Sequence, residues 1–311
     1  MGVYTCVQRG ARSRFGRRLL GVAAGAAVVV VPAIVSPALA SAAGGVTGYQ
    51  IVHGDATTVM AGQSVAANAT CRSGKVVTSG GVVSHSPLTF ISSSYPLNSK
   101  TWRVVVTDTG TQTYPESFTP YTVCVNPSSV PGYHIVRTGQ LPVGPNTYYG
   151  PNLAIGDSYC GAQEVVIGGG VQDHNTSSLL TITRPTTDDR AWEVEVHLTT
   201  PPLSGADYYE VSSVCIPSAD LTSYSLDDNP GSYGTSLTQA MPSNTAGSGY
   251  CAAGTLAVAG GATNHDQQNG FISSISPATG GQYWLATDTD ISPPSYGESF
   301  DVTAVCVTGT T

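Results

Sequence analysis

The segment Cys160-Gly-Ala-Gln-Glu-Val-Val-Ile-Gly168-Gly169-Gly170 decides the fold, because the chain contains three versions of it. The first is Cys71-Arg-Ser-Gly-Lys-Val-Val-Thr-Ser-Gly80-Gly81, and the third is Cys251-Ala-Ala-Gly-Thr-Leu-Ala-Val-Ala-Gly260-Gly261. Each version begins with a cysteine and has a pair of glycines nine and ten residues later. Self-similarity of this kind indicates a repeat architecture.

The sequence around these segments repeats in the same order. In each copy a tyrosine precedes the opening cysteine, and a proline, a tryptophan and a closing cysteine follow it. In chain order these landmarks are Tyr49, Tyr133 and Tyr224; Pro96, Pro185 and Pro277; Trp102, Trp192 and Trp284; and Cys124, Cys215 and Cys306. We therefore divide the chain after residue 42 into β-repeat 1 (43–127), β-repeat 2 (128–218) and β-repeat 3 (219–311).

Each repeat is predicted to be built of short β-strands. From Trp192 to Leu198, apolar residues alternate with Glu193, Glu195 and His197, which is the period of a strand with one apolar and one hydrated face. Charged residues make up only 10% of the chain, against about 25% in a typical soluble domain. No apolar stripe at helical spacing occurs after residue 43. The sequence therefore predicts an all-β fold.

Two architectures are compatible with this pattern. We favour three antiparallel, sandwich-like repeats in tandem, packed closely and joined by short connections at residues 126–131 and 217–223. The alternative is a single pseudo-threefold body, such as a β-prism, with one sheet for each repeat. Disulfides that join different repeats would support the alternative.

Six cysteines remain after the predicted signal, and they are expected to form disulfides. An exported chain meets an oxidising environment, in which six cysteines allow 15 pairings. The repetition favours the pairing that each repeat makes alone: Cys71–Cys124, Cys160–Cys215 and Cys251–Cys306. Closing a loop of about 55 residues stabilises the folded state by about 4 kcal/mol in the chain-entropy model. No pair has the two-residue spacing of a zinc knuckle, so metal binding by these thiols is not expected.

The first 42 residues are predicted to be a signal peptide. A basic segment with five arginines, from Arg9 to Arg18, precedes an apolar run at 19–35 and two small-residue cleavage sites near Ala40 and Ala42. Its removal leaves seven basic and 20 acidic residues, a net charge of −13. Such a charge disfavours nucleic acids and anionic membranes as partners. We expect a secreted, extracellular protein without a membrane segment after cleavage.

The Cys-x-x-Gly…Gly-Gly…Trp…Cys pattern, which extends from Tyr49 to Val307, resembles that of secreted actinobacterial proteins built from β-repeats. Gln163 stands where the first glycine of the motif is expected, and Ser79 and Ala259 replace a possible third glycine of the run. The resemblance implies a structural β-repeat and no particular activity.

Three histidines occupy one repeated position. His85, His174 and His265 each follow the opening cysteine of their repeat by 14 residues. The simplest interpretation is a histidine that binds a loop in every repeat. Two alternatives remain open, namely a ligand contact on three separate loops and a shared three-histidine metal centre. No cofactor and no catalytic residue is predicted, and whether a metal binds is left open.

The acidic pairs at 188–189, 227–228 and 288–290 are expected in solvated turns. For function, the first hypothesis is a non-enzymatic extracellular module that binds a glycan or a cell-surface protein through repeated weak sites, since linking weak sites raises avidity. The second is an extracellular hydrolase, dependent on a metal or on carboxylates. The third is a structural protein of the cell envelope.

Overall fold

The computed structural model describes residues 45–143, 153–174, 178–198, 208–229, 243–265, 270–290 and 300–310. The chain from Ser41 to Thr311 forms one compact unit. The predicted signal peptide lies outside the described residues. In the described part all regular structure is β-strand apart from two 3-10 turns, η1 (Pro127–Ser129) and η2 (Ser218–Asp220). Both turns lie in the connections expected between repeats. No described helix has the length and apolarity needed to cross a bilayer.

The strands form three antiparallel sheets, and every sheet combines two repeats. Sheet I joins repeats 1 and 3 in the order β1 (Gln50–His53), β7 (Glu116–Val125), β4 (Val76–Ser84), β18 (Gly270–Pro277), β19 (Tyr283–Asp290) and β16 (Ser243–Tyr250), with β2 (Thr57–Val59) also on β7. Sheet II joins repeats 1 and 2 in the order β3 (Ser64–Thr70), β6 (Thr101–Asp108), β5 (Thr89–Asn98), β11 (Glu164–Asp173), β14 (Tyr208–Pro217) and β8 (His134–Arg137), with β9 (Leu141–Pro142) also on β14. Sheet III joins repeats 2 and 3 in the order β10 (Leu153–Tyr159), β13 (Ala191–Leu198), β12 (Ser178–Pro185), β17 (Thr255–Asn264), β20 (Phe300–Thr308) and β15 (Tyr224–Asn229).

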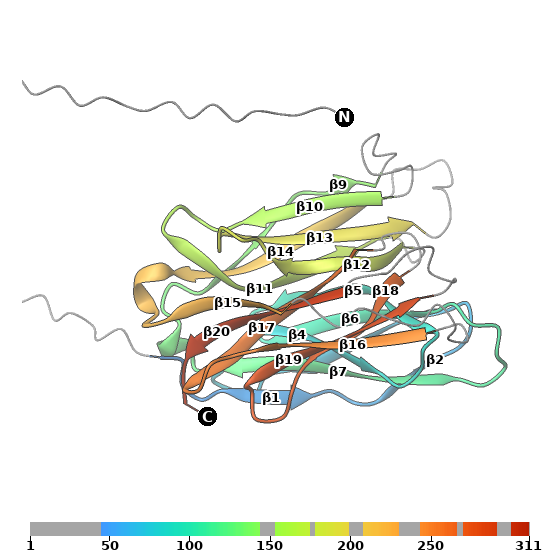
Figure 1. Ribbon diagram of the computed structural model, residues 1–311, viewed down its shortest axis with the longest axis horizontal. Coiled ribbons are helices and arrows are strands. Elements are labelled where there is room, and N and C mark those ends of the chain that lie inside the picture. Colours follow the sequence, from blue (N-terminus) through green and yellow to red (C-terminus); the bar gives the residue numbers. More distant parts are fainter. Residues whose placement is uncertain are drawn as a thin grey trace, which may run out of the picture. The chain divides into compact units, whose positions relative to one another are not determined.

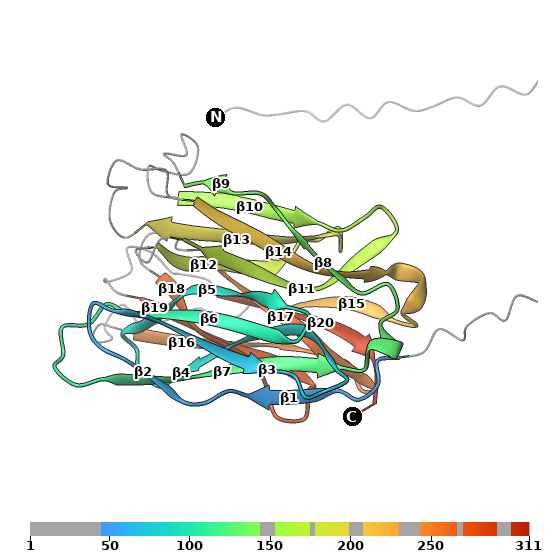
Figure 2. The ribbon, with the colours of Figure 1, turned by 180° about the vertical axis from the view of Figure 1, so that it is seen from behind.

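Each repeat therefore contributes half of two different sheets. Within repeat 1, β4 of sheet I packs against β5 and β6 of sheet II, so that the repeat is a two-layer sandwich. The predicted all-β fold of three sandwich-like repeats is confirmed. The repeats are not separate modules, because each sheet continues from one repeat into the next. Figures 1 and 2 show this for sheet I, where β18 and β19 of repeat 3 lie beside β4 and β7 of repeat 1.

The first glycine of each pair makes room for the tryptophan of its own repeat. A β-carbon at Gly80 would lie 2.4 Å from the ring of Trp102. The corresponding distances are 2.3 Å for Gly169 with Trp192 and 2.1 Å for Gly260 with Trp284. All three indole rings are fully buried. Because any larger residue would overlap the ring, the glycine and the tryptophan recur together in the sequence.

The second glycine of each pair lets the next repeat approach. A β-carbon at Gly81 would lie 2.0 Å from the carbonyl oxygen of Ile275 in repeat 3. The same relation holds for Gly170 with Ser94 at 1.8 Å and for Gly261 with Thr183 at 2.2 Å. These are the points where β4 pairs with β18, β11 with β5, and β17 with β12. The glycine pair thus builds both the core of a repeat and its junction with a neighbour.

The three glycine strands, β4, β11 and β17, also contact one another pairwise. Each carries a β-bulge seven residues after the opening cysteine, at Thr78, Ile167 and Val258. These side chains are fully buried, and the Thr78 hydroxyl donates a hydrogen bond of 2.9 Å to the Val258 carbonyl oxygen. The bulges therefore mark the centre of a pseudo-threefold arrangement. The alternative architecture shared this threefold arrangement, but its one sheet for each repeat is not found, because each sheet belongs to two repeats.

The tyrosines that precede the opening cysteines, here called the opening tyrosines, form a second set of contacts between repeats. The Tyr49 hydroxyl donates to the carbonyl oxygen of Ala257 in repeat 3 at 3.0 Å, and the Tyr224 hydroxyl donates to that of Val166 in repeat 2 at 2.8 Å. The hydroxyl of Tyr133, the third member of the set, is buried without a hydrogen-bond partner among the described residues. Burial raises the pKa of all three phenols.

The disulfides follow the predicted pairing within repeats. The bonds are Cys71–Cys124, Cys160–Cys215 and Cys251–Cys306, with Cα–Cα distances of 5.7, 5.6 and 5.4 Å. These distances are typical of native disulfides. Each bond ties the turn that precedes a glycine strand to the closing strand of the same repeat. The covalent links therefore stay inside the repeats, and the junctions between repeats are non-covalent.

Candidate functional site

The repeated histidines lie at the ends of the glycine strands and contact their own repeats. The backbone N–H of His85 donates to the Ser117 carbonyl oxygen at 3.1 Å, and that of His174 donates to the Tyr208 carbonyl oxygen at 3.2 Å. The His174 ring also packs against the ring of Tyr208, with 4.5 Å between centroids. These contacts are those of histidines that hold the end of the adjacent strand.

Two of these histidines face a carboxylate of their own repeat. The His174 Nε2 atom lies 3.8 Å from the Glu210 carboxylate, and the His265 Nε2 atom lies 2.7 Å from the Asp301 carboxylate. Both acids stand five residues before the closing cysteine, where repeat 1 has Thr119. Each of these two imidazole rings therefore contacts a carboxylate of its own repeat.

The structure does not gather the three histidines into one cluster. Within the described ranges, the group of possible metal ligands that lies close together is His134, Glu164 and Cys215. The Cys215 sulfur is bonded to Cys160, so it is not available as a thiolate ligand. A ligand contact by His85, His174 or His265 on separate loops stays a prediction.

Two expectations about the acidic residues are wrong. Glu195, assigned to a hydrated face, is 0% exposed on β13, and its carboxylate accepts a hydrogen bond of 2.7 Å from the Thr181 hydroxyl. Burial raises the pKa of Glu195 to about 7. Asp288 and Asp290, expected in a solvated turn, are buried on β19. Alternation in a sequence separates the two faces of a strand, but it does not tell whether both are covered.

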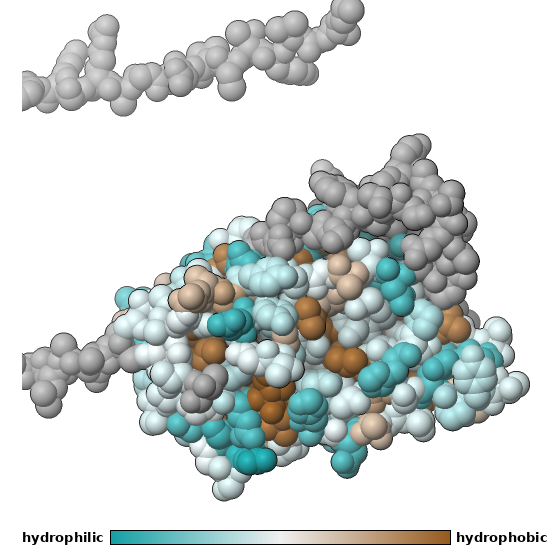
Figure 3. Space-filling model, turned by 60° about the horizontal axis from the view of Figure 1, so that its bottom comes forward, coloured by the Kyte–Doolittle hydropathy of each residue, from teal (hydrophilic) through white to brown (hydrophobic). Residues whose placement is uncertain are grey.

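A groove of about 520 Å³ lies on sheet I, on the face that points away from the tryptophans, where repeat 1 meets repeat 3. Figure 3, in which the lower side of Figure 1 comes forward, shows apolar side chains at several places among hydrophilic ones. The groove is lined by residues of both repeats, namely Ile51, His53, Val83, Tyr121, Ser276, Pro277, Ala278, Thr279, Gly280, Tyr283 and Leu285.

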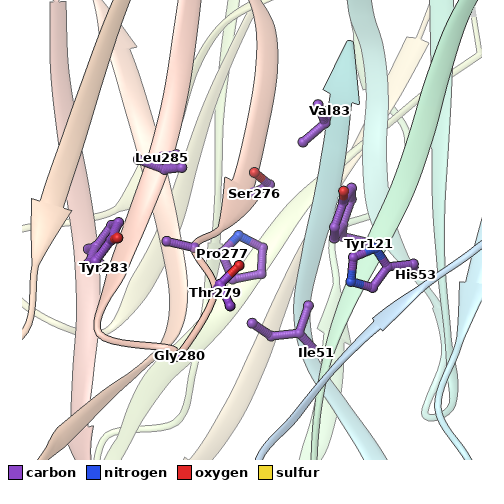
Figure 4. Close-up of a pocket in the computed structure, with 11 residues that line it drawn as sticks. Ile51, His53, Val83, Tyr121, Ser276, Pro277, Thr279, Gly280, Tyr283 and Leu285 are labelled. Carbon is purple, nitrogen blue, oxygen red and sulfur yellow. The ribbon is translucent and has the colours of Figure 1, made fainter. Parts of the chain in front are cut away.

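Aromatic side chains stand at both sides of this groove (Figure 4). On one side, the rings of His53 and Tyr121 lie 4.4 Å apart between centroids. On the other side, Tyr283 packs against Tyr250 with 5.4 Å between centroids, and Tyr250 is 55% exposed. Partial burial raises the pKa of Tyr121. Both sides therefore offer ring surfaces to a ligand.

The middle of the groove is small and uncharged. Ser276 and Pro277 come from the end of β18, and Thr279 and Gly280 from the turn that follows it; Figure 4 shows the labelled side chains between the two aromatic sides. Two hydroxyl groups, those of Ser276 and Thr279, are the polar side-chain groups here. No carboxylate, lysine or arginine is among the described lining residues. The groove thus combines apolar rings with neutral hydrogen-bonding groups.

The equivalent places on the other two sheets are occupied by larger side chains. Ser276 precedes the proline of repeat 3, and the same position holds Tyr95 in repeat 1 and Arg184 in repeat 2. Tyr95 and Ser276 are each only 4% exposed, so the two positions differ in the volume that the side chain fills and not in exposure. On sheet III, Arg184 lies over Gly261 and forms an ion pair of 2.9 Å with Glu193. A serine at this position leaves sheet I open where a ring or a guanidinium stands on the other two.

On sheet II an arginine also bridges the corresponding space. Arg137 of β8 occupies the position that His53 has in β1, as the strand registers show. Its guanidinium donates hydrogen bonds of 2.6 and 2.8 Å to the carbonyl oxygens of Pro96 and Leu97. These residues correspond to Pro277 and Ala278 of the groove. Among the described residues, the open groove is therefore a feature of the repeat 1–repeat 3 junction that the equivalent positions of the other two sheets do not share.

The repeat pattern of the sequence does not predict this groove. The feature of the sequence that points to it is the small Ser276, where the other repeats have Tyr95 and Arg184. This difference indicates a groove only once it is known that the side chain at this position lies on the outer face of its sheet. Neither the family models nor the curated proteins compared with the chain include a match to it.

Proposed function

We propose that this protein is secreted, that it is a non-enzymatic binding protein, and that the groove on sheet I binds an uncharged glycan. The observation that carries the proposal is the pairing of partly exposed aromatic rings with neutral hydroxyl groups in one groove. Sugar rings have apolar faces that stack on aromatic side chains and hydroxyl groups that need hydrogen-bond partners. The basic and apolar N-terminal segment and the three disulfides support secretion.

The groove supports binding at one place better than at three equal places. Its counterparts on sheets II and III carry Tyr95 with Arg137, and Arg184, in the space that the groove leaves open. Glycoside hydrolysis with a carboxylate pair is less well supported, because the described lining residues include no carboxylate. We therefore propose retention of a glycan and no chemical conversion.

The test is a binding measurement on the purified mature chain. Calorimetry with soluble cello- and chito-oligosaccharides is expected to detect binding, and Tyr121→Ala is expected to weaken it at least tenfold. The matched control is Tyr159→Ala, because Tyr159 is a tyrosine with 57% exposure on sheet III. The control should leave the affinity unchanged. Absence of binding to every oligosaccharide, or equal loss in both variants, would count against the groove as a glycan site.

The same sample distinguishes the other two functions. A hydrolase would release shorter oligosaccharides, which chromatography of the incubated ligands detects. A structural envelope protein would self-associate, which sedimentation detects at rising protein concentration. Neither behaviour is expected for the proposed binding protein.

A further inference from the structure

The two aromatic sides of the groove belong to different repeats and to strands that are not adjacent. Tyr121 is on β7 of repeat 1, and Tyr283 is on β19 of repeat 3. In sheet I the strands β4 and β18 lie between them. Three inter-strand spacings of a β-sheet amount to about 14 Å. One sugar ring is too small to contact both tyrosines.

The groove is continuous between the two aromatic sides, because the side chain of Ser276 is too small to fill its middle. Both tyrosines line the same groove, and Ser276 with Pro277 forms the floor between them. Tyr95 occupies the equivalent position on sheet II, where it is only 4% exposed. The fold therefore accepts a tyrosine at the Ser276 position. With a tyrosine at 276, the middle of the groove would be filled and the two aromatic sides separated.

We infer that the ligand is a chain of several sugar units that crosses the groove from repeat 1 to repeat 3, and that Ser276 determines this specificity by leaving room for the middle of the chain. The inference rests on the proposed glycan-binding function. One unit stacks near Tyr121, another near Tyr283, and the units between them pass over Ser276 within reach of the Thr279 hydroxyl. The binding site is complete only because the two repeats share sheet I.

The first experiment measures affinity against chain length. Cello- and chito-oligosaccharides of one to six units are titrated into the mature chain by calorimetry. Affinity is expected to rise at least tenfold from one unit to the length that reaches both sides and then to level off. Equal affinity for one unit and for six would overturn the inference while leaving the glycan-binding function intact. No binding at any length would contradict both the inference and the glycan-binding function. A proline-rich peptide is titrated in the same way, and binding of this peptide in place of any sugar would also contradict both.

The second experiment uses Ser276→Tyr, which copies the residue of repeat 1. We expect this variant to lose the gain in affinity with length and to keep the weak binding of a single unit, because the end aromatics are unchanged. The matched control is Arg184→Tyr, which places the same residue at the same position of sheet III, outside the groove. It should bind all lengths as the wild type does. Unchanged length dependence in Ser276→Tyr would remove Ser276 from the site.

A double-mutant cycle tests whether one ligand joins the two sides. Tyr121→Ala and Tyr283→Ala are combined, and each variant is titrated with one unit and with the longest oligosaccharide. For a chain that contacts both tyrosines, the effects on the longest ligand are coupled and those on a single unit are not. Independent effects at every length would indicate two separate small sites and would overturn the inference. Circular dichroism of each variant confirms that the fold is retained.

Discussion

The indole nitrogen of Trp102 donates a hydrogen bond of 2.9 Å to the Ser94 hydroxyl. Trp192 has the same bond with Thr183 at 2.8 Å. In repeat 3 the equivalent residue is Ile275, and the buried indole nitrogen of Trp284 has no hydrogen-bond partner among the described residues. A buried donor without a partner costs about 1–3 kcal/mol, so repeat 3 carries a local instability that the other two repeats avoid.

We predict that a hydroxyl at position 275 stabilises the protein. Ile275→Thr and Ile275→Val differ by one hydroxyl in place of a methyl group, and a buried site ordinarily prefers valine. Here the threonine variant should be the more stable by about 1 kcal/mol, because it gives Trp284 an acceptor. Thr183→Val should cost about 1–3 kcal/mol for the opposite reason. Urea unfolding of the four proteins measures this, and a valine variant more stable than the threonine one would contradict it.

A second prediction concerns the glycine that faces the neighbouring repeat. Gly81→Ala is expected to lower the free energy of unfolding by about 3 kcal/mol, because its β-carbon would overlap the Ile275 carbonyl oxygen. Gly139→Ala is the matched control, since Gly139 has no neighbouring atom within 4 Å and does not have a positive φ. The control should be neutral or slightly stabilising. Thermal unfolding compares them, and equal effects would mean that the junction is loosely packed.

These glycines also show how far the sequence alone predicts the fold. Their spacing from Cys71 and Trp102 gave the repeats, the strands and the disulfide pairing, because those features depend on contacts inside one repeat. The pairing of sheets across repeats was not predictable in the same way. A strand pattern is the same whether the partner strand belongs to its own repeat or to the next one. Contacts between repeats, such as that of Gly81 with Ile275, are what distinguish the two cases.

The candidate site was less predictable than the fold. The three histidines were predicted as candidates because they recur. Recurrence, however, is typical of residues with a structural role in every repeat, such as His174, which contacts its own repeat. A site that occurs once must instead appear as a departure from the repeat. Ser276 is such a departure, and its significance depends on Tyr95 and Arg184 facing away from the core, which the sequence does not state.

The third prediction follows from the buried Glu195. Its pKa is raised from 4.5 to about 7 in the folded protein, so the folded state holds this proton more tightly than the unfolded state does. The stability that the neutral carboxyl contributes is fully present below pH 4.5 and is lost as the pH rises toward 7. The loss amounts to about 3 kcal/mol. Urea unfolding between pH 4.5 and 8 measures it.

Glu195→Gln should flatten this part of the profile, because the amide is neutral at every pH and can still accept the hydrogen bond from Thr181. Glu116→Gln, on β7 of sheet I, serves as the control and should keep the wild-type slope. If both variants retain the slope, another group is responsible for the pH dependence.

The fourth prediction uses the three opening tyrosines as an internal comparison. Tyr49→Phe and Tyr224→Phe each remove a hydrogen bond to another repeat and leave a carbonyl oxygen without that donor, so each should cost about 1 kcal/mol. Tyr133→Phe removes a buried hydroxyl that has no partner in the described part of the chain, and it should be neutral or raise the stability by up to about 1 kcal/mol. Because the three substitutions delete the same atom at equivalent positions, differences in their unfolding free energies report the hydrogen bond alone. Equal losses at all three positions would show that Tyr133 has a partner in solution and that the links between repeats are symmetric.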